Sequence, residues 1–350
     1  MGTRHLIEQL EQNGVLSKEE FVELISSSSD EDKEYAKQRA RAIGDACFGK
    51  KIYVRGLIEF TNYCKNDCLY CGIRKSNKNA KRYRLTEEEI LACCDEGKEL
   101  GFRTFVLQGG EDAYYTDERV VDLIRKIKER HPDCALTLSI GERDRESYEK
   151  FYEAGADRYL LRHETASDAH YRKLHPPELS LEHRKNCLRQ LKEIGFQTGC
   201  GFMVGSPGQT EETLAEDFLF IHELQPEMVG IGPFIPHQDT IFAQETQGTL
   251  EQTLFLLSLL RIMEKNLLLP ATTALATIHP TGRELGILAG ANVLMPNLSP
   301  VSVRDKYSLY DGKVCTGDEA AECRHCLERR VQGIGYEIVV ERGDHPSRRN

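Results

Sequence analysis

Short apolar runs alternate with amphipathic helical segments from residue 51 to about residue 300, and this alternation constrains the fold more than any other feature of the chain. Buried parallel strands read as short apolar runs, whereas core-facing helices repeat their apolar residues with a helical period. Eight such β–α units favour a complete (β/α)8 TIM-type barrel within the α/β class over an open sheet. The expected strands are 52–60, 103–108, 134–140, 157–162, 197–205, 228–232, 268–274 and 291–296.

The two ends of the chain lack this repeat. Residues 1–50 are charged, Gly14 predicts the end of a first helix, and the Ser/Asp-rich run at 26–34 predicts an N-cap for a later one. Thr86 and Glu89 have the spacing of a capping box for the first barrel helix. We therefore expect an N-terminal helical cap over 1–50, the barrel over 51–300 and a C-terminal extension over 301–350.

The charge and the apolar pattern exclude several classes of protein. The net charge is −10, so we expect no general attraction to nucleic acid or to an anionic membrane. No stretch approaches the roughly 20 apolar residues that a membrane span needs, and the first residues do not resemble a signal peptide. We expect a cytoplasmic protein, in which clustered cysteines bind metal or do chemistry more often than they form disulfides.

Three of the twelve cysteines form the motif CKNDCLYC at 64–71. Three thiolates on one tight loop can bind three irons of a [4Fe-4S] cubane and leave the fourth iron without a protein ligand. S-adenosylmethionine (SAM) suits that iron, because its amino and carboxylate groups can chelate it. An electron from the cluster then cleaves the sulfonium C–S bond to a 5′-deoxyadenosyl radical. A zinc site is the alternative for Cys64, Cys68 and Cys71, but it needs a fourth ligand that the neighbouring sequence lacks.

Other polar motifs also follow expected strands, where barrel enzymes carry their chemistry. Arg162 and Glu164, in RHET, stand two residues apart, so both side chains point the same way; the arginine can bind the SAM carboxylate and the glutamate the ribose hydroxyls. A surface ion pair is the alternative for these two. Arg184 is a second candidate for the carboxylate, with a solvated helix arginine as its alternative. Tyr70, before the third cysteine, can pack beside adenine.

Arg55 interrupts an otherwise apolar strand. If its side chain points into the barrel, it is a buried cation that needs an anionic partner, and the alternative is an arginine that points outward. Together with Gln108, Thr272 and Thr273 at strand ends, it predicts a polar pocket for an anionic substrate.

These motifs in this order resemble the radical SAM superfamily. In that superfamily the segment after the second strand carries a GGE-like motif whose backbone contacts the SAM amino group. Gly109, Gly110 and Glu111 match it here.

A closer resemblance covers about residues 50 to 330. Its segments are similar to the HydE family of radical SAM [FeFe]-hydrogenase maturases, to which biotin synthase and methylornithine synthase are related; they are 59–86, 107–112, 155–166, 228–240, 270–278 and 291–300. The resemblance implies an enzyme that acts in assembly of the diiron subsite of the H-cluster, on a small-molecule or organometallic substrate. It implies as partners a radical SAM tyrosine lyase, a GTPase scaffold and an electron donor such as a flavodoxin or ferredoxin.

A second group of cysteines, Cys315, Cys323 and Cys326, also matches that family, in which it can hold an accessory [2Fe-2S] or [4Fe-4S] cluster. From the residues alone it is a metal site with an undecided fourth ligand, with His325 close by, and zinc is an alternative metal. Two other functions stay open at this point. One is a mutase or sulfur-inserting radical SAM enzyme, and the other is an iron–sulfur carrier without chemistry of its own.

Overall fold

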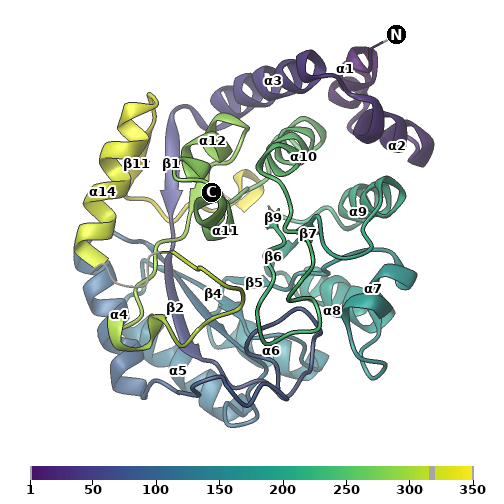
Figure 1. Ribbon diagram of the computed structural model, residues 1–350. Coiled ribbons are helices and arrows are strands. Elements are labelled where there is room, and N and C mark those ends of the chain that lie inside the picture. Colours follow the sequence, from purple (N-terminus) through teal and green to yellow (C-terminus); the bar gives the residue numbers. More distant parts are fainter. Residues whose placement is uncertain (1, 315–319, 349–350) are drawn as a thin grey trace.

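A computed structural model describes residues 2–314 and 320–348 (Figure 1). The first helices are α1 (Arg4–Asn13), α2 (Lys18–Ser27) and α3 (Asp30–Phe48). As predicted, Gly14 ends α1 in the left-handed conformation, with φ 74°, and Ser29 begins α3 with a capping box. These helices pack on the outside of α9 (Glu211–Leu224) and α10 (Leu250–Met263), where the rings of Phe21 and Phe218 lie 5.1 Å apart.

A six-stranded parallel sheet forms the centre of the molecule, in the order β2-β3-β4-β5-β6-β8. A second sheet has the order β10-β1-β11 and a third pairs β7 with β9, again in parallel. The strands are β1 (Lys51–Val54), β2 (Gly56–Thr61), β3 (Thr104–Gly109), β4 (Ala135–Ser139), β5 (Arg158–Leu160), β6 (Gln197–Cys200), β7 (Met203–Val204), β8 (Met228–Val229), β9 (Gly232–Pro233), β10 (Val293–Leu294) and β11 (Glu337–Val339).

Helices alternate with these strands and bury their apolar faces against them. Val120, Ile124 and Ile127 of α5 are buried, as their spacing predicts, and Thr86 begins α4 with the expected capping box. The remaining helices are α4 (Glu87–Glu99), α5 (Asp117–Arg130), α6 (Arg145–Glu153), α7 (Asp168–Leu174), α8 (Leu181–Ile194), α11 (Thr273–Ile278), α12 (Gly282–Leu288), α13 (Val301–Arg304), α14 (Ala320–Gly333) and the 3-10 turn η1 (Pro346–Arg348).

The strand prediction is confirmed for seven of the eight runs and is wrong for 268–274, where α11 already begins at Thr273. Leu268 and Pro270 make only isolated parallel bridges, to Met228 and Val293. Proline lacks a backbone donor, which explains why a regular ladder does not form there. Three of the predicted runs are each split into two short strands, the first of them at Arg55.

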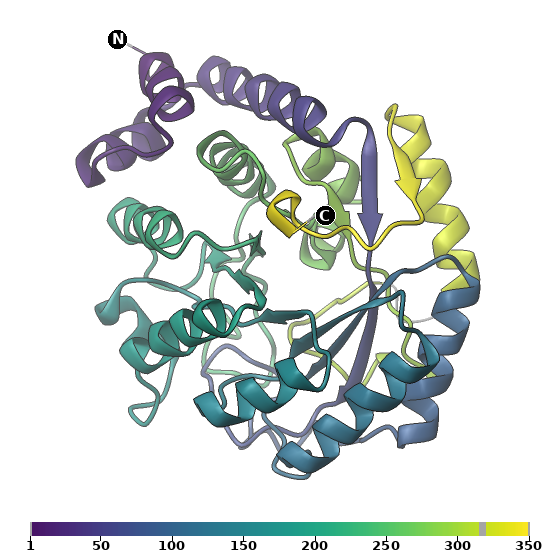
Figure 2. The same cartoon turned by 180° about the vertical axis from the view of Figure 1, so that it is seen from behind.

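The C-terminal segment adds a strand that the sequence did not predict. β11 pairs in parallel with β1, and the residues after it cross the amino ends of the central strands (Figure 2). There Asp344 lies 2.7 Å from Arg158 Nη2, at the start of β5, and accepts a hydrogen bond from Gln197 of β6. This segment therefore covers the amino end of the sheet. No helix in the described ranges is long and apolar enough to cross a membrane.

Candidate functional site

A cavity of about 370 Å3 opens at the carboxyl ends of the strands. It is large enough for a cofactor and is lined by residues from most of the strand ends, as the alternating fold requires. Nearly all residues that the sequence singled out line this one cavity: Cys64, Cys68, Tyr70, Cys71, Gln108, Gly109, Gly110, Glu111, Arg162, Glu164, Arg184, Thr272 and Thr273.

The three cysteines lie on a long loop between β2 and α4 that contains no helix. The guanidinium of Arg82 holds this loop together, because it donates to four backbone carbonyls within it. The acceptors are Asn62, Ile73, Arg74 and Asn77, at 2.5, 2.7, 2.6 and 3.2 Å. The loop is therefore ordered by a side chain of its own. Arg82 was not predicted, because a basic residue in a basic segment gives no signal of such a role.

The three thiols suit an iron–sulfur cluster better than a single metal ion. Burial raises the pKa of Cys64, Cys68 and Cys71, that of Cys71 to about 12, so a strong positive charge is needed to make them thiolates. Among the described residues, no three His, Cys, Asp or Glu side chains converge on one ion position, as a zinc site at about 2.3 Å would need. The described cavity lining contains no fourth cysteine and no histidine.

The glycine motif after β3 packs directly against the start of this loop. A Cβ on Gly110 would lie 2.2 Å from the carbonyl oxygen of Tyr63 and 2.8 Å from Cys64 Cβ, so no larger residue fits. The backbone N–H of Lys65 donates to the carbonyl of Glu111 at 2.9 Å. The buried Glu111 carboxylate accepts from the N–H of Glu142 at 3.0 Å. The motif thus joins the cysteine loop to the loop after β4.

Arg162 and Glu164 pair with each other inside the cavity, at 3.1 Å between Nη2 and Oε2. The side chains of Arg162 and Glu164 are 32% and 10% exposed, and both line the cavity. Their contact has the distance of an ion pair but not the geometry of a hydrogen bond, so Arg162 Nε and Glu164 Oε2 have no hydrogen-bond partner. Glu164 also has φ 66°, a conformation that costs energy for a residue with a Cβ. An unsatisfied, strained pair in a cavity is ready to bind a polar ligand.

A buried pair behind this segment holds it in place. Gly201 N–H donates to His163 Nδ1 at 3.2 Å, so Nε2 carries the proton and donates to Asp217 Oδ1, also at 3.2 Å. The same oxygen accepts from the N–H of Ala166 at 2.5 Å. Burial lowers the pKa of His163 to about 3, so the imidazole is neutral. This pair was not predicted; its one signal in the sequence is an aspartate on the apolar face of a helix.

Arg184 is buried, so the interpretation of it as a solvated helix arginine is wrong. Its Nε pairs with Glu142, and its Nη1 donates to the carbonyl of Arg162 at 2.7 Å. Arg184 therefore fixes the backbone of Arg162 from behind as well as lining the cavity.

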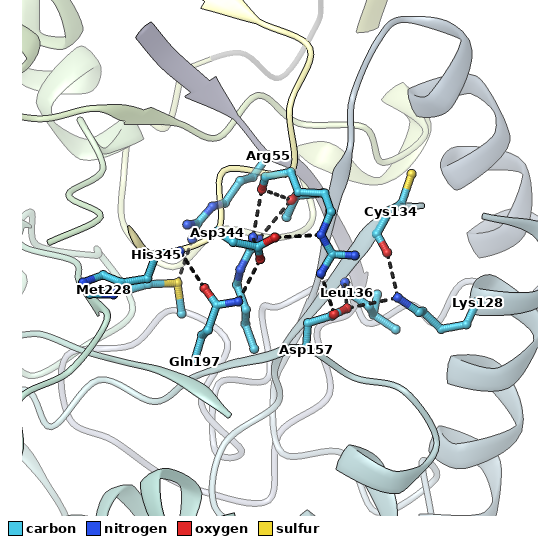
Figure 3. A network of polar contacts seen from close by, with 12 residues as sticks. Arg55, Lys128, Cys134, Leu136, Asp157, Gln197, Met228, Asp344 and His345 are labelled. Carbon is cyan, nitrogen blue, oxygen red and sulfur yellow. Dashed lines mark hydrogen bonds and ion pairs between the residues drawn. The ribbon is translucent and has the colours of Figure 1, made fainter. Parts of the chain in front are cut away.

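The structure separates the four residues predicted to contact an anionic substrate. Gln108, Thr272 and Thr273 line the cavity, and the hydroxyl of Thr272 is buried without a hydrogen-bond partner. Arg55 does not line it. Arg55 is buried between β1 and β2, where its Nη1 lies 2.8 Å from Met228 Sδ, in the network around Asp344 (Figure 3). The prediction for Arg55 is wrong because its side chain points toward the amino ends of the strands.

A second ion pair in the cavity wall comes from the C-terminal extension. The Glu59 side chain is 2% exposed, and its two oxygens contact Lys313 Nζ at 2.5 Å and Asn297 Nδ2 at 2.8 Å. Lys313 also lies 5.0 Å from the ring of Tyr307 and lines the cavity with it. Sequence patterns gave no sign of this pair, because its members are 254 residues apart.

Of the second cysteine group, Cys315 and the side chain of Cys323 lie outside the described residues. Cys326 is exposed on α14. The accessory cluster therefore stays a prediction.

Comparisons with known proteins place the chain among radical SAM proteins. A profile of the radical SAM superfamily matches residues 58–221. The "[FeFe] hydrogenase maturase subunit HydE" of Thermotoga maritima is 45% identical over 335 residues, which cover 96% of this chain and 95% of that protein. The 3-methylornithine synthase of Methanosarcina barkeri is 32% identical over 290 residues, covering 82% and 81%.

Solved structures show the same fold. A crystal structure of methylornithine synthase (PylB) superposes with a TM-score of 0.84 at 28% identity, over 95% of this chain and 97% of that one. The hydrogenase maturase HydG superposes with a TM-score of 0.82 over 97% of this chain and 76% of that one, at 19% identity.

Proposed function

This chain belongs to the HydE family of radical SAM [FeFe]-hydrogenase maturases, and we propose that it cleaves SAM reductively during assembly of the diiron subsite of the H-cluster. The observation that carries the proposal is the joint placement of three cysteines and an unsatisfied Arg–Glu pair around one cavity.

Cys64, Cys68 and Cys71 hold the [4Fe-4S] cluster in this proposal. When bound, the cluster supplies the electron that splits the sulfonium C–S bond of SAM and yields the 5′-deoxyadenosyl radical. The chain positions the cluster, because Arg82 orders the cysteine loop and Gly110 lets this loop approach the end of β3.

We assign the contacts with SAM to residues from several segments. The backbone at Gly109, Gly110 and Glu111 faces the amino group. Arg162 binds the carboxylate and Glu164 the ribose hydroxyls, since both have polar atoms without hydrogen-bond partners in the cavity. Two further residues that line the cavity complete the set: Tyr70, beside the adenine, and Arg184, near the carboxylate.

The far side of the cavity accepts the substrate. Gln108, Thr272 and Thr273 are uncharged donors, and the free hydroxyl of Thr272 suits an anionic or sulfur-containing group. Lys313 supplies a cation at the same wall, although Glu59 already pairs with it. We propose a small-molecule or organometallic substrate on this basis.

Several further assignments belong to the same proposal. The partners are the radical SAM tyrosine lyase, the GTPase scaffold and a flavodoxin or ferredoxin, and the protein acts in the cytoplasm. Cys315, Cys323 and Cys326 hold an accessory cluster.

The domain boundaries lie at about residues 50 and 300. The bridges at Leu268 and Pro270 support one complete barrel, because they join β8 to β10 through the seventh predicted strand.

The test has two stages. Anaerobically reconstituted protein is first reduced with dithionite in the presence of SAM, and 5′-deoxyadenosine is measured; a Cys68→Ala variant is the control and yields none. The protein is then added with both companion maturases to an apo-hydrogenase, and hydrogen evolution is expected. Methylornithine formed from lysine would instead assign the chemistry of the methylornithine synthases, which the 32% identity makes the second candidate.

A further inference from the structure

The loop that carries the cysteines has the opposite charge to the rest of the chain. Residues 64–84 contain seven lysines and arginines and one acid, Asp67, for a net charge of +6. Because the whole chain carries −10, the remaining residues carry −16. A positive region on an acidic protein creates a local field that attracts anionic partners.

Three lysines stand out on this loop. Lys75, Lys78 and Lys81 are exposed, and none of them makes an ion pair within the part of the chain that the structure describes. Of the acids nearby, Asp67 pairs with Arg74 at 4.0 Å and accepts from Ser76 at 2.7 Å, and Asp239 accepts from Asn79 at 2.8 Å. The three charges are therefore directed to solvent beside the cysteine loop.

Exposed aromatic rings lie on the same loop and its neighbour. Tyr63 is 36% and Tyr114 47% exposed, two of the five large apolar side chains that are exposed in the described chain. The Arg84 guanidinium lies 3.9 Å from the ring of Tyr63 and 4.8 Å from that of Tyr114, and Arg119 stacks on Tyr114 at 3.8 Å. Exposed tyrosine and arginine are the residue types enriched at protein interfaces. Tyr63 directly precedes Cys64, so the stack borders the cysteine loop.

We propose that this surface docks a small acidic protein that carries one electron. It is called the cysteine-loop face and consists of Tyr63, Lys75, Lys78, Lys81, Arg84 and Tyr114. The inference rests on the proposed function, because reductive cleavage of SAM needs an external electron. One electron leaves the donor, which is oxidised, and reduces the cluster by one; no bond or proton is exchanged.

The partner is a protein rather than a nucleic acid because the lysines accompany a fixed Tyr–Arg stack and the chain as a whole is acidic. Transient redox complexes bury little area, so long-range charge attraction sets the rate at which they form. A donor with an acidic surface is steered to this face and repelled by the rest of the molecule.

The experiment measures reduction of the reconstituted cluster by a chemically pre-reduced flavodoxin, followed by stopped-flow loss of cluster absorbance. The test variant is K75E/K78E/K81E. The control, K37E/K150E/K265E, makes the same change in net charge on α3, on α6 and after α10. Dithionite-driven SAM cleavage is measured for all three proteins, and it separates a docking defect from a failure of the proposed function.

We expect the test variant to be reduced by flavodoxin about tenfold more slowly than wild type at low salt, and to lose most of its salt dependence. The control variant should keep the wild-type rate, and dithionite-driven cleavage should be equal in all three. Equal flavodoxin rates for test and control variants would overturn the proposal. It is also overturned if a short single-stranded RNA binds wild type but not the test variant while both are reduced by flavodoxin at the same rate.

Discussion

Replacing Asp344 by Asn tests how the amino end of the sheet is held together. Asp344 Oδ1 lies 2.7 Å from Nη2 of Arg158, a side chain with 0% exposure. Arg55, also buried, is a second cation in the same network. Asparagine keeps the shape and one acceptor oxygen, so the variant removes the negative charge and one of the two acceptors that Arg158, Gln197 and Arg342 use.

Removing one partner of a buried ion pair costs about 3–5 kcal/mol, because the other charge stays buried without compensation. Asp344 is 17% exposed, and water at that edge relieves part of the penalty. We therefore expect D344N to lower the free energy of unfolding by about 3 kcal/mol at pH 7.

The pH dependence provides a second measure. Burial by itself would raise the pKa of Asp344, but the charges of Arg158 and Arg342 lower it below its usual value. A carboxyl with a lowered folded pKa contributes stability above its unfolded pKa of about 3.9 and loses it as the pH falls through the folded value. The difference between wild type and D344N should therefore be constant from pH 7 to about pH 5 and shrink below about pH 4.

The assay is urea unfolding of the metal-free protein, followed by far-UV circular dichroism. The control is Glu341→Gln in the same segment, whose pair with Lys51 is 43% exposed on both sides and should be worth less than about 1 kcal/mol. If D344N loses no more than E341Q, Asp344 does not compensate the buried arginine and the reasoning fails.

Three other predictions concern the cavity. Arg82→Lys loses the planar donor set that serves four carbonyls, so reconstituted protein should hold less than about half the wild-type iron per chain; wild-type iron content would contradict this. Asp217→Ala releases His163, and we expect about tenfold weaker SAM binding by calorimetry with unchanged iron content, whereas unchanged affinity would remove its positioning role. Lys313→Met leaves the Glu59 carboxylate buried without its cation and should cost about 3 kcal/mol in urea unfolding; a second change, Glu59→Gln, should recover most of it, and no recovery would refute the pairing.

Local and periodic features were predictable from the sequence. The capping boxes at Ser29 and Thr86 need only neighbouring residues, and the strand order follows from alternation. It was also predictable that the site residues lie close together, because parallel strands place all of their carboxyl ends at one edge. What these rules cannot give is the partner of each polar side chain. Arg184 and Glu142 are 42 residues apart, and no periodicity links them.

Arg55 shows that the position of a residue in the sequence does not by itself predict where its side chain points. It lies between two short strands, and its guanidinium faces the amino end of the sheet, near Met228 and Asp344. Arg55 was predicted to lie beside Thr272 because both are polar residues on expected strands. β11 and Asp344, which come almost 290 residues later, give it an electrostatic environment at the other end of the sheet.

Access to the cavity, more than charge or hydrogen-bond satisfaction, separates the two ends of the central strands, because Arg162 and Glu164 line the cavity. At the amino end, both Asp344 oxygens and both terminal nitrogens of Arg158 have partners. Arg158 Nε and the Nε and Nη2 of Arg55 are buried there without a hydrogen-bond partner, but neither side chain lines the cavity that a ligand can enter. At the carboxyl end, Arg162 and Glu164 keep polar atoms without partners although they touch each other. An unsatisfied buried group costs free energy that a ligand can recover on binding. The carboxyl end is therefore the end where binding of a polar cofactor is favoured, and the loop of Cys64 borders that end alone.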